Sequence, residues 1–390
     1  MRRVRLKEIG TFYSGLSGKS KSDFSEGNAL LVTYRNIFNT PVLNPAIKDT
    51  VVVGKNEKQN EVLWGDILIT GSSETPADAG MSSVVLFNPQ EKMYLNSFCF
   101  GFRLNDMNEA LPSYIGHLLR STSIRAAISK TAFGVTRFNV NRMRFADIEI
   151  PLPPLNIQKE IVSILDSFTS LIDKMKQEVE MRKKQMEYYR EKLMAPQKNW
   201  EIKTLGEIGT FTRGNGLQKS DFRVKGFPCV HYGQIHTYYN TCIYKTKSFC
   251  EEDLAKKLQK ASYGDLLIAT TSEDVKACCK AAVWFGAGDV AYSGDSFCYS
   301  HDQDPKYMAY LFQTEMFAKQ KQKAATGAKV IRVSGESMAS FSFAFPPLVQ
   351  QRQIASILDT FETYISKLEK MIELRQKQYE YYREKLLTFE

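Results

Sequence analysis

The sequence contains an internal duplication, which restricts the fold more than any other feature. Four pairs of segments match in the same order: 6–12 with 205–211, 64–69 with 263–268, 97–100 with 296–299, and 188–193 with 381–386. The first three pairs are 199 residues apart and the last pair is 193 residues apart, so the second copy has lost six residues overall. We therefore expect two copies of one fold.

The two copies differ most in their interiors. Residues 19–60 and 218–260 hardly agree outside short strand-like fragments, whereas the C-terminal parts of the copies agree closely, with Tyr188–Leu193 identical to Tyr381–Leu386. Copies that share their strand and helix pattern but differ in the segments between them indicate one fold that carries two different binding specificities.

Each copy begins with short apolar runs that are separated by Gly, Asn, Pro and Ser, a pattern typical of strands and loops. In the first copy these runs lie at 30–32, 51–53, 67–69 and 84–87. A helical stretch near 111–130, with a counterpart near 305–324, comes next, and Pro153-Pro154 or Pro346-Pro347 ends each sheet region because proline favours extended backbone there. The predicted fold class is α/β in the mixed α+β sense, with two similar domains.

A long helix follows each double proline. Residues that step alternately by four and three form a nearly unbroken apolar seam, the pattern of a coiled coil. The seam residues are Ile161, Leu165, Phe168, Ile172, Met175, Val179, Met186, Tyr189 and Leu193 in the first copy, and Ile354, Leu358, Phe361, Ile365, Leu368, Ile372, Tyr379, Tyr382 and Leu386 in the second. Arg182 and Arg375 interrupt the seam at equivalent positions, where a polar residue can fix the register. One helix cannot bury this seam alone, so we expect the two helices to pair.

These patterns divide the chain into a globular domain at 1–155, a helix at 156–195, a second globular domain at 196–348 and a C-terminal helix at 349–390. The charge follows the same division. Residues 1–155 hold 18 Lys and Arg against 14 Asp and Glu, residues 196–348 hold 19 against 15, and the two helical segments are close to neutral. A polyanion such as DNA would be attracted to the two globular domains.

The cysteines and the N-terminus narrow the class of protein further. The seven cysteines show neither a CxxC motif nor a Cys/His cluster with zinc spacing, so we expect reduced thiols and no metal. Cys278 and Cys279 are interpreted as strand residues. The first ten residues lack the apolar core of a signal peptide, and no apolar run is long enough to span a membrane, which predicts a cytoplasmic protein.

With these features, the chain resembles the specificity subunits of type I restriction-modification enzymes over essentially its whole length. The resemblance is carried by the duplication, by the strands Trp64–Ile69 and Tyr263–Ile268, and by the Pro-Pro-Leu exits at 153–155 and 346–348 into helices that carry glutamine near their start. The second exit departs from the first, because Ser342-Phe343-Ala344 replaces the first proline of the motif region.

The resemblance implies two target-recognition domains and an antiparallel pair of helices. It also implies a split DNA site, of which each domain reads one half, with a spacer that the helices set. The expected partners are double-stranded DNA, two modification subunits that methylate adenine with S-adenosylmethionine, and two translocating restriction subunits. No cofactor is expected on this chain, and the chain is expected to be non-catalytic.

Four other classes of protein share some of these features. A fused amino-methyltransferase needs an (Asn/Asp/Ser)-Pro-Pro-aromatic loop and a glycine-rich cofactor loop, and both are missing here. A nuclease is suggested only by Glu273-Asp274-Val275-Lys276, which has no upstream acidic partner. A coiled-coil adaptor with protein-binding heads explains the helices but not two diverged basic domains, and an orphan specificity protein that modulates a methyltransferase also stays open.

Candidate DNA contacts are polar, basic or aromatic residues in loops, because such side chains read bases and phosphates. In the first domain they are Lys19, Lys21, Tyr34, Arg35, Asn36, Ser73, Glu74, Arg137, Asn139 and Arg142. In the second domain they are Arg213, Gln218, Lys219, His231, Tyr232, Gln234, Ser272, Glu273, Lys276, Lys329 and Arg332. No catalytic or metal-binding residue is predicted.

Overall fold

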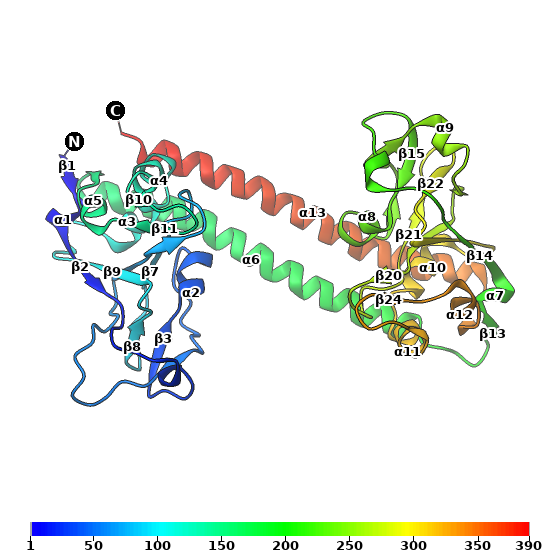
Figure 1. Cartoon of the computed structure of the whole chain (residues 1–390), viewed down its shortest axis with the longest axis horizontal. Coiled ribbons are helices and arrows are strands. Elements are labelled where there is room, and N and C mark those ends of the chain that lie inside the picture. The colour runs from blue at the N-terminus through cyan, green and yellow to red at the C-terminus, as the bar shows by residue number, and fades with distance from the viewer. Residues whose placement is uncertain (1, 390) are drawn as a thin grey trace. The chain divides into compact units, whose positions relative to one another are not determined.

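The computed structural model describes residues 2–389, which form two compact units (Figure 1). Unit 1 combines Met1–Lys176 with Lys370–Glu390, and unit 2 is Gln177–Glu369. Each unit therefore contains a globular part and halves of two long helices. We call residues 2–154 head 1 and residues 194–347 head 2.

Head 1 consists of short strands and helices that end at the long helix α6 (Leu155–Leu193). Its strands are β1 (Arg2–Arg5), β2 (Gly10–Ser14), β3 (Ala29–Val32), β4 (Thr50–Val51), β5 (Ile67–Thr70), β6 (Ser72–Ser73), β7 (Ser82–Val84), β8 (Met93–Leu95), β9 (Cys99–Leu104), β10 (Ala132–Phe133), β11 (Phe138–Val140) and β12 (Glu149–Leu152). Its helices are α1 (Leu6–Ile9), η1 (Lys21–Phe24), α2 (Tyr34–Asn39), α3 (Pro112–Leu119), α4 (Thr122–Ser129) and α5 (Arg142–Ala146).

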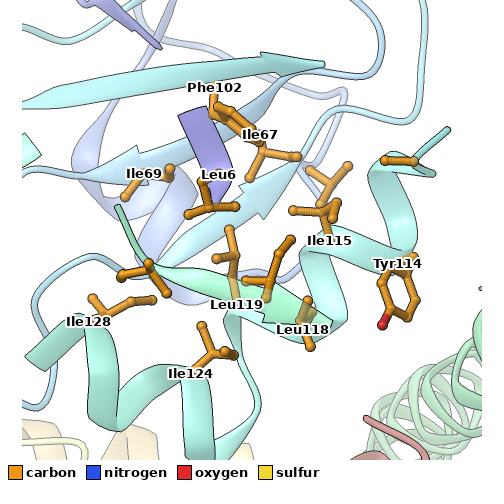
Figure 2. Packing of buried hydrophobic residues seen from close by; sticks show 14 of the residues in the cluster. Leu6, Ile67, Ile69, Phe102, Tyr114, Ile115, Leu118, Leu119, Ile124 and Ile128 are labelled. Atoms are coloured by element: carbon orange, nitrogen blue, oxygen red, sulfur yellow. The ribbon is translucent and has the colours of Figure 1, made fainter. Parts of the chain in front are cut away.

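The strands of head 1 form four small sheets, in the orders β2-β9-β5-β7, β4-β3-β8, β10-β11-β6 and β1-β12. The main core lies between the first sheet and helices α3 and α4. Figure 2 shows Leu118 and Leu119 of α3 near Leu6 and Ile67, all of them fully buried. Proline at the first position of α3 suits the helix start, because that position needs no amide donor.

Head 2 repeats this architecture and ends at α13 (Leu348–Leu387). Its strands are β13 (Glu201–Thr204), β14 (Gly209–Arg213), β15 (Phe227–Val230), β16 (Cys242–Ile243), β17 (Ser248–Cys250), β18 (Lys260–Ala261), β19 (Leu266–Ala269), β20 (Thr271–Ser272), β21 (Lys280–Trp284), β22 (Val290–Tyr292), β23 (Ser296–His301), β24 (Ile331–Arg332) and β25 (Ser342–Phe345). Its helices are α7 (Leu205–Ile208), η2 (Lys219–Asp221), α8 (Tyr232–Thr237), α9 (Glu252–Ala255), α10 (Pro305–Leu311), α11 (Glu315–Ala324) and α12 (Gly335–Ala339).

The sheets of head 2 are β14-β23-β19-β21-β16, β17-β15-β22-β18, β20-β24 and β13-β25. They keep the order of the head 1 sheets, with β16 and β18 added at the edges of the first two and no named counterpart of β10 in the third. The first of these sheets packs on α10 and α11 through an aromatic core, in which Phe312 stacks on Phe317 with 4.2 Å between ring centroids. The expected duplication of a mixed α/β domain is confirmed.

The long helices pair in opposite directions, as the apolar seam predicted. In unit 1, Phe168 in the first half of α6 stacks on Tyr382 near the end of α13, with 5.4 Å between centroids. In unit 2, Tyr189 near the end of α6 stacks on Phe361 in the first half of α13, at 5.5 Å. The seam residues are buried or half-buried apart from Tyr382, which remains 39% exposed.

A buried glutamine joins each head to its exit helix. Gln158 of α6 donates to the carbonyls of Pro153 and Glu109 and accepts from the amide of Leu111, all at 2.9 Å. Gln351 of α13 repeats this arrangement, since its amide group donates to Pro346 O at 2.8 Å and its oxygen accepts from Asp304 N at 3.0 Å. Because each amide satisfies backbone groups of both elements, it fixes the start of the helix on the head.

One pairing read from the sequence is wrong. The match of 97–100 with 296–299 equates Phe100 with Tyr299, but the ladders place Phe100 opposite Ile69 and Phe297 opposite Ile268. Phe100 therefore corresponds to Phe297, a shift of two residues. Side chains in a strand alternate with a period of two, so a two-residue shift preserves the buried face and is invisible to the pattern.

Cys278 and Cys279 were expected in a strand, and this is also wrong. They lie in the turn that precedes β21, which begins at Lys280. Cys279 has a φ of 62°, a left-handed conformation that no strand contains. Residues 281–284 of β21 are apolar, and this apolar run predicts a strand that starts before its actual first residue.

Candidate nucleic-acid interface

Head 1 contains an open groove of about 550 Å³ that three segments build together. Its lining residues are Tyr34 and Phe38 of α2, Ser72 and Ser73 of β6, Glu74, Thr75 and Asp78 of the next turn, and Thr136 and Arg137 of the β10–β11 hairpin. Four of the predicted DNA contacts, Tyr34, Ser73, Glu74 and Arg137, thus meet in one place although they are distant in the sequence.

The hairpin is held beside β6 by strand pairing. Phe138 pairs with Ser73 and Asn139 with Ser72, which brings Arg137 to the rim of the groove. Gly134 makes the tight turn possible, because its φ is 133° and a Cβ there would lie 2.0 Å from the carbonyl oxygen of Arg137. The guanidinium of Arg137 lies over the exposed ring of Phe98, 5.4 Å from its centroid.

The groove combines opposite charges with an unsatisfied hydroxyl. Glu74 and Asp78 can accept from the amino groups of bases, and Arg137 can donate to guanine or phosphate. The Oγ of Ser72 is buried and has no hydrogen-bond partner within residues 2–389. A buried polar atom without a partner is costly to the fold.

Other predicted contacts of head 1 already have intramolecular partners. Asn36 caps α2, with its oxygen 2.8 Å from the amide of Thr33. Lys19 pairs with Glu57 at 2.5 Å, and this hydrogen bond lowers the pKa of Glu57 to about 2. Arg142 donates to Ser14 Oγ at 2.7 Å and lies over Phe100. Lys21, Arg35 and Asn139 are exposed.

Head 2 places its corresponding segments in the same way. Thr271 and Ser272 of β20 pair with Arg332 and Ile331 of β24, and Gly327 at φ 100° makes the tight turn of the hairpin. The predicted contacts Glu273, Lys276, Lys329 and Arg332 are exposed around this pairing, and Ser272 is half-buried. The basic side chains of this region lie on the turn, the hairpin and β24.

Several predicted contacts of head 2 have structural roles. His231 is buried, and its Nδ1 accepts from the amide of Gly233 at 3.2 Å at the start of α8. Gln234 accepts from His231 N at 3.0 Å and donates to Ser248 Oγ at 2.6 Å. Arg213 donates to Gly294 O at 3.1 Å. Gln218 and Lys219 are exposed, and Tyr232 is half-buried with its ring beside that of His231.

Sequence reasoning missed the exposed apolar residues next to the groove of head 1. Val135 at the hairpin tip is 90% exposed, Met143 is 80% exposed, and Phe98 and Phe133 are each 58% exposed. Exposed aromatic rings can stack on bases or on the sugar-phosphate chain. The sequence does indicate the hairpin pair, because Phe133 and Val135 are apolar residues on either side of Gly134, where a turn would expose them.

The described residues contain no group of three or more His, Cys, Asp or Glu side chains that could hold a metal ion. Glu273 and Asp274, the acidic pair of the nuclease interpretation, are exposed residues of the turn after β20. Across residues 2–389, no helix has the length and apolarity that crossing a bilayer requires.

Two similar heads with diverged exposed surfaces, each continuous with a long paired helix, define a recognition protein that presents two different surfaces on one frame. The family model described as the type I restriction modification DNA specificity domain matches twice, at residues 1–181 and 197–376. The chain therefore belongs to the type I restriction-modification DNA specificity family.

Individual relatives agree with this assignment. A Haemophilus influenzae protein described as a candidate type I restriction enzyme specificity subunit is 30% identical over 272 residues, which cover 66% of this chain and 68% of the relative. The EcoR124I/EcoR124II specificity subunit of Escherichia coli is 28% identical over 254 residues, covering 62% of this chain and 63% of the relative. These alignments thus span about two thirds of each relative.

A solved structure shares the fold. The crystal structure of the type I restriction-modification S subunit from M. genitalium aligns with a TM-score of 0.57 and 15% identity, covering 100% of this chain and 96% of that chain.

Proposed function

We propose that this chain reads a split DNA site, with each head recognising one half. The observation that carries the proposal is the duplicated frame with different surfaces. Ser73 and Glu74 of head 1 recur as Ser272 and Glu273, but Asp78, Thr136 and Arg137 correspond to Ala277, Lys329 and Val330. Because the frames match and the exposed side chains differ, the two heads should prefer different bases.

The paired helices would set the spacer between the two half-sites. α6 is one unbroken helix of 39 residues, about 60 Å at 1.5 Å per residue, and its two halves belong to different units. DNA advances about 34 Å per turn, so a helix pair of this length suits two sites that are separated by bases the protein does not read.

The helices would also bind the modification subunits. Apart from the seam, each helix carries a second apolar stripe: Ile164, Leu171, Met181 and Tyr188 in α6, and Ile357, Tyr364, Met371, Leu374 and Tyr381 in α13, all at least 40% exposed. Four members recur at a spacing of 193 residues, so the stripe is duplicated with the chain. Two equivalent apolar surfaces fit two copies of one partner.

In this proposal the chain itself catalyses nothing. S-adenosylmethionine would bind only to the modification subunits, which methylate adenine, and two restriction subunits would complete the assembly. The DNA ligand implies that the complex acts in the cytoplasm. An orphan specificity protein that redirects a methyltransferase would use the same surfaces. A coiled-coil adaptor with protein-binding heads is the competing function, and it requires no preference for DNA sequence.

The exchange Arg137→Val tests the proposal, because it gives head 1 the side chain that head 2 carries at this place. The readout is the methylated motif, obtained by sequencing modified adenines in cells that express the variant with its modification subunit. We expect the first half-site to become less specific at one base pair, since a bidentate arginine contributes about 1–3 kcal/mol of discrimination. Relaxation in both half-sites, or an unchanged motif, would contradict the assignment of the groove.

A further inference from the structure

Head 2 contains a pair of adjacent cysteines in a turn that leads from β20 to β21. The sulfur atoms of Cys278 and Cys279 are 3.9 Å apart, and both side chains are buried. Both residues line a cavity of about 550 Å³ that Lys276 and Lys321 also line. The pair is therefore enclosed by protein but borders a space that a small molecule can occupy.

Head 1 shows what this turn requires when no sulfur is present. The ladder pairs Ile69 with Ser82 in head 1 and Ile268 with Ala281 in head 2, so Ala79 and Gly80 occupy the places of Cys278 and Cys279. Gly80 has a φ of 68°, almost equal to the 62° of Cys279. The frame thus imposes a left-handed conformation at this position in both heads.

The backbone of Cys279 is strained in a way that a glycine at this position would not be. Among residues 2–389 it is the one residue other than glycine with a positive φ. The left-handed conformation costs a side-chain-bearing residue about 1–2 kcal/mol. Packing does not explain this cost, because head 1 closes the same turn with Ala79 and Gly80. A strained residue that the fold does not need is an indication of function.

A third residue changes together with the two cysteines. Lys321 of α11 occupies the place that Ile128 has in α4 of head 1. The Ile128 side chain faces the turn of head 1, because a Cβ on Gly80 would lie 2.6 Å from Ile128 Cγ2. Lys321 Nζ donates to the carbonyls of Cys278 at 2.7 Å and Lys276 at 2.9 Å. The substitution brings a buried ammonium group to the two thiols.

Head 1 supplies a cation to the same two carbonyls from a different residue of the helix. There Arg125 donates to Ala77 O and Ala79 O, both at 2.6 Å, from one helical turn earlier on α4. The carbonyls of the turn therefore need a donor in both heads. In head 2 the donor is Lys321, at the helix position that faces the turn. A cation at the turn is thus common to both heads, and the pair of sulfur atoms beside it is specific to head 2.

The surroundings of the two thiols favour reaction at Cys278. The hydrogen bond from the Cys279 thiol, followed by the charge of Lys321, lowers the pKa of Cys278, whereas the same hydrogen bond raises the pKa of Cys279. The other five cysteines have raised pKa values, because burial disfavours their thiolates. The thiolate is the reactive form, so Cys278 is the expected nucleophile.

We propose that Cys278 and Cys279 form a reversible modification site, which a peroxide converts into a disulfide between neighbouring residues. The Cys278 thiolate attacks one oxygen of hydrogen peroxide, so that an S–O bond forms and the O–O bond breaks. The leaving hydroxide takes up a proton and becomes water. The Cys279 sulfur then attacks Cys278 Sγ, an S–S bond forms, the S–O bond breaks, and a second water leaves. Two thiols and one peroxide thus give one disulfide and two waters, with the sulfurs oxidised and the peroxide reduced.

The product should be easily reduced. Adjacent Cα atoms are about 3.8 Å apart, closer than the usual separation across a disulfide, so the ring is strained. Strained disulfides are the labile, regulatory type. A thiol reductant should therefore restore the dithiol, which distinguishes this site from a permanent structural bridge.

The modification would act on DNA recognition by head 2, a consequence that rests on the proposed function. The turn that contains the pair also carries Glu273 and Lys276, two predicted DNA contacts. Closing the ring draws the sulfurs from 3.9 Å to about 2 Å and removes the hydrogen bond of 3.1 Å that the Cys278 thiol donates to Thr270 O. Head 1 has no sulfur at this place, so only one half-site should respond.

The experiment treats the full-length chain with increasing hydrogen peroxide, denatures it, alkylates the free thiols and maps the cysteines by mass spectrometry. We expect a peptide in which Cys278 and Cys279 resist alkylation and are lighter by two hydrogen atoms, and dithiothreitol should reverse this change. Cys242 is partly exposed and has a raised pKa, so it serves as the internal comparison. If Cys242 is oxidised while Cys278 and Cys279 still alkylate fully, the proposal is wrong.

The double exchange Cys278→Ala with Cys279→Gly is the matched control, because it gives head 2 the sequence that head 1 uses in this turn. Hydrogen exchange in residues 271–277 should change on oxidation of the original chain and stay constant in the variant. A disulfide that forms without any change in hydrogen exchange would overturn the effect on the turn. If oxidation changes the turn but leaves the second half of the methylated motif unchanged, the modification site stands and its effect on DNA recognition is wrong.

Discussion

The carboxylate of Asp66 in head 1 is fully buried and depends on one arginine. It accepts from Arg103 Nε and Nη2, both at 2.7 Å, and from the Tyr13 hydroxyl at 2.7 Å. Burial of the ring, followed by the negative charge of Asp66 and the hydrogen bond to it, raises the pKa of Tyr13 well above its ordinary value. By strand register, head 2 has Ser300 in the place of Arg103. The backbone bond is common to both heads, since Asp66 accepts from Leu63 N and Asp265 from Ser262 N, each at 2.8 Å, and the arginine is the partner that head 1 adds.

We predict that Arg103→Ser destabilises unit 1 by about 3–5 kcal/mol, because it leaves a buried carboxylate without its partner. Hydrogen exchange in β5 and β9 would report the local free energy of opening. Ser300→Ala in head 2 is the comparison and should cost under about 0.5 kcal/mol. The addition of Asp66→Asn should recover part of the loss, and a double variant as unstable as the sum of the two single variants would rule out the pair.

Buried His231 and half-buried His301 couple the stability of head 2 to pH. Burial lowers the pKa of His231 and that of His301 from the ordinary 6.5. The unfolded chain therefore binds protons at a higher pH than the folded chain does. Stability from these groups is complete above about pH 6.5 and is lost as the pH falls below it.

We predict that His231→Asn makes this loss shallower, since asparagine can accept from the Gly233 amide but does not titrate. One histidine contributes a slope of at most about 1.4 kcal/mol per pH unit. Urea unfolding between pH 7.5 and 5.5, followed by tryptophan fluorescence in a Trp64→Phe background, would isolate head 2. An unchanged pH slope in the variant would show that His231 is not the responsible group.

At the level of residues, the sequence indicated which segments carry polar side chains but not how these are used. Asn36 and Gln234 have the composition of base-reading residues, yet both cap a short helix. A capping residue and a DNA contact use the same side-chain chemistry, and only the backbone position separates them. The meeting of Tyr34 with Arg137 in one groove depends on strand pairing across the chain, which local patterns do not encode.

Among the elements, the second apolar stripe of the long helices leads to a prediction about assembly. Leu171 and Ile357 are 40% and 44% exposed, and neither belongs to the seam. Leu171→Glu with Ile357→Glu should leave the fold intact, because exposed substitutions change stability by about 0.5 kcal/mol or less. Binding of the modification subunit should weaken roughly tenfold or more, which corresponds to about 1.4 kcal/mol.

The matched control is Gln177→Glu with Thr363→Glu, which adds the same two charges at exposed positions of α6 and α13 away from the stripe. Calorimetry with the purified modification subunit measures both variants, and circular dichroism verifies their helices. Equal affinity of the stripe variant, the control and the original chain would place the docking surface elsewhere.

The long helices were the elements that the sequence predicted best. Their seams repeat every seven residues over ten positions, and no other element has a signal of this length. Short strands carry far less information, which is why the pattern predicts residues 97–100 two residues out of register and a strand where 278–279 form a turn. The positive φ of Cys279 had no signal in the sequence, because cysteine does not mark left-handed turns.

For the whole molecule, the duplication predicted the architecture because it reports on topology directly. A sequence that repeats its strands, its double prolines and its helices in one order must repeat the fold that they build. The differences between the copies were equally informative, since Arg137 against Val330 and Ala79-Gly80 against Cys278-Cys279 show where the two heads present different side chains on the same frame. The bases that each head reads depend on side-chain positions against DNA, which no repeat determines.

The central claim is that the heads read separate half-sites while the helices set the spacer. The most direct measurement is the methylated motif in cells whose chain has residues 1–153 replaced by the corresponding head of a relative, with α6, head 2 and α13 unchanged. The account predicts a new first half-site, the original second half-site and a spacer of the original length. A change in both half-sites, or a changed spacer with unchanged helices, would contradict it.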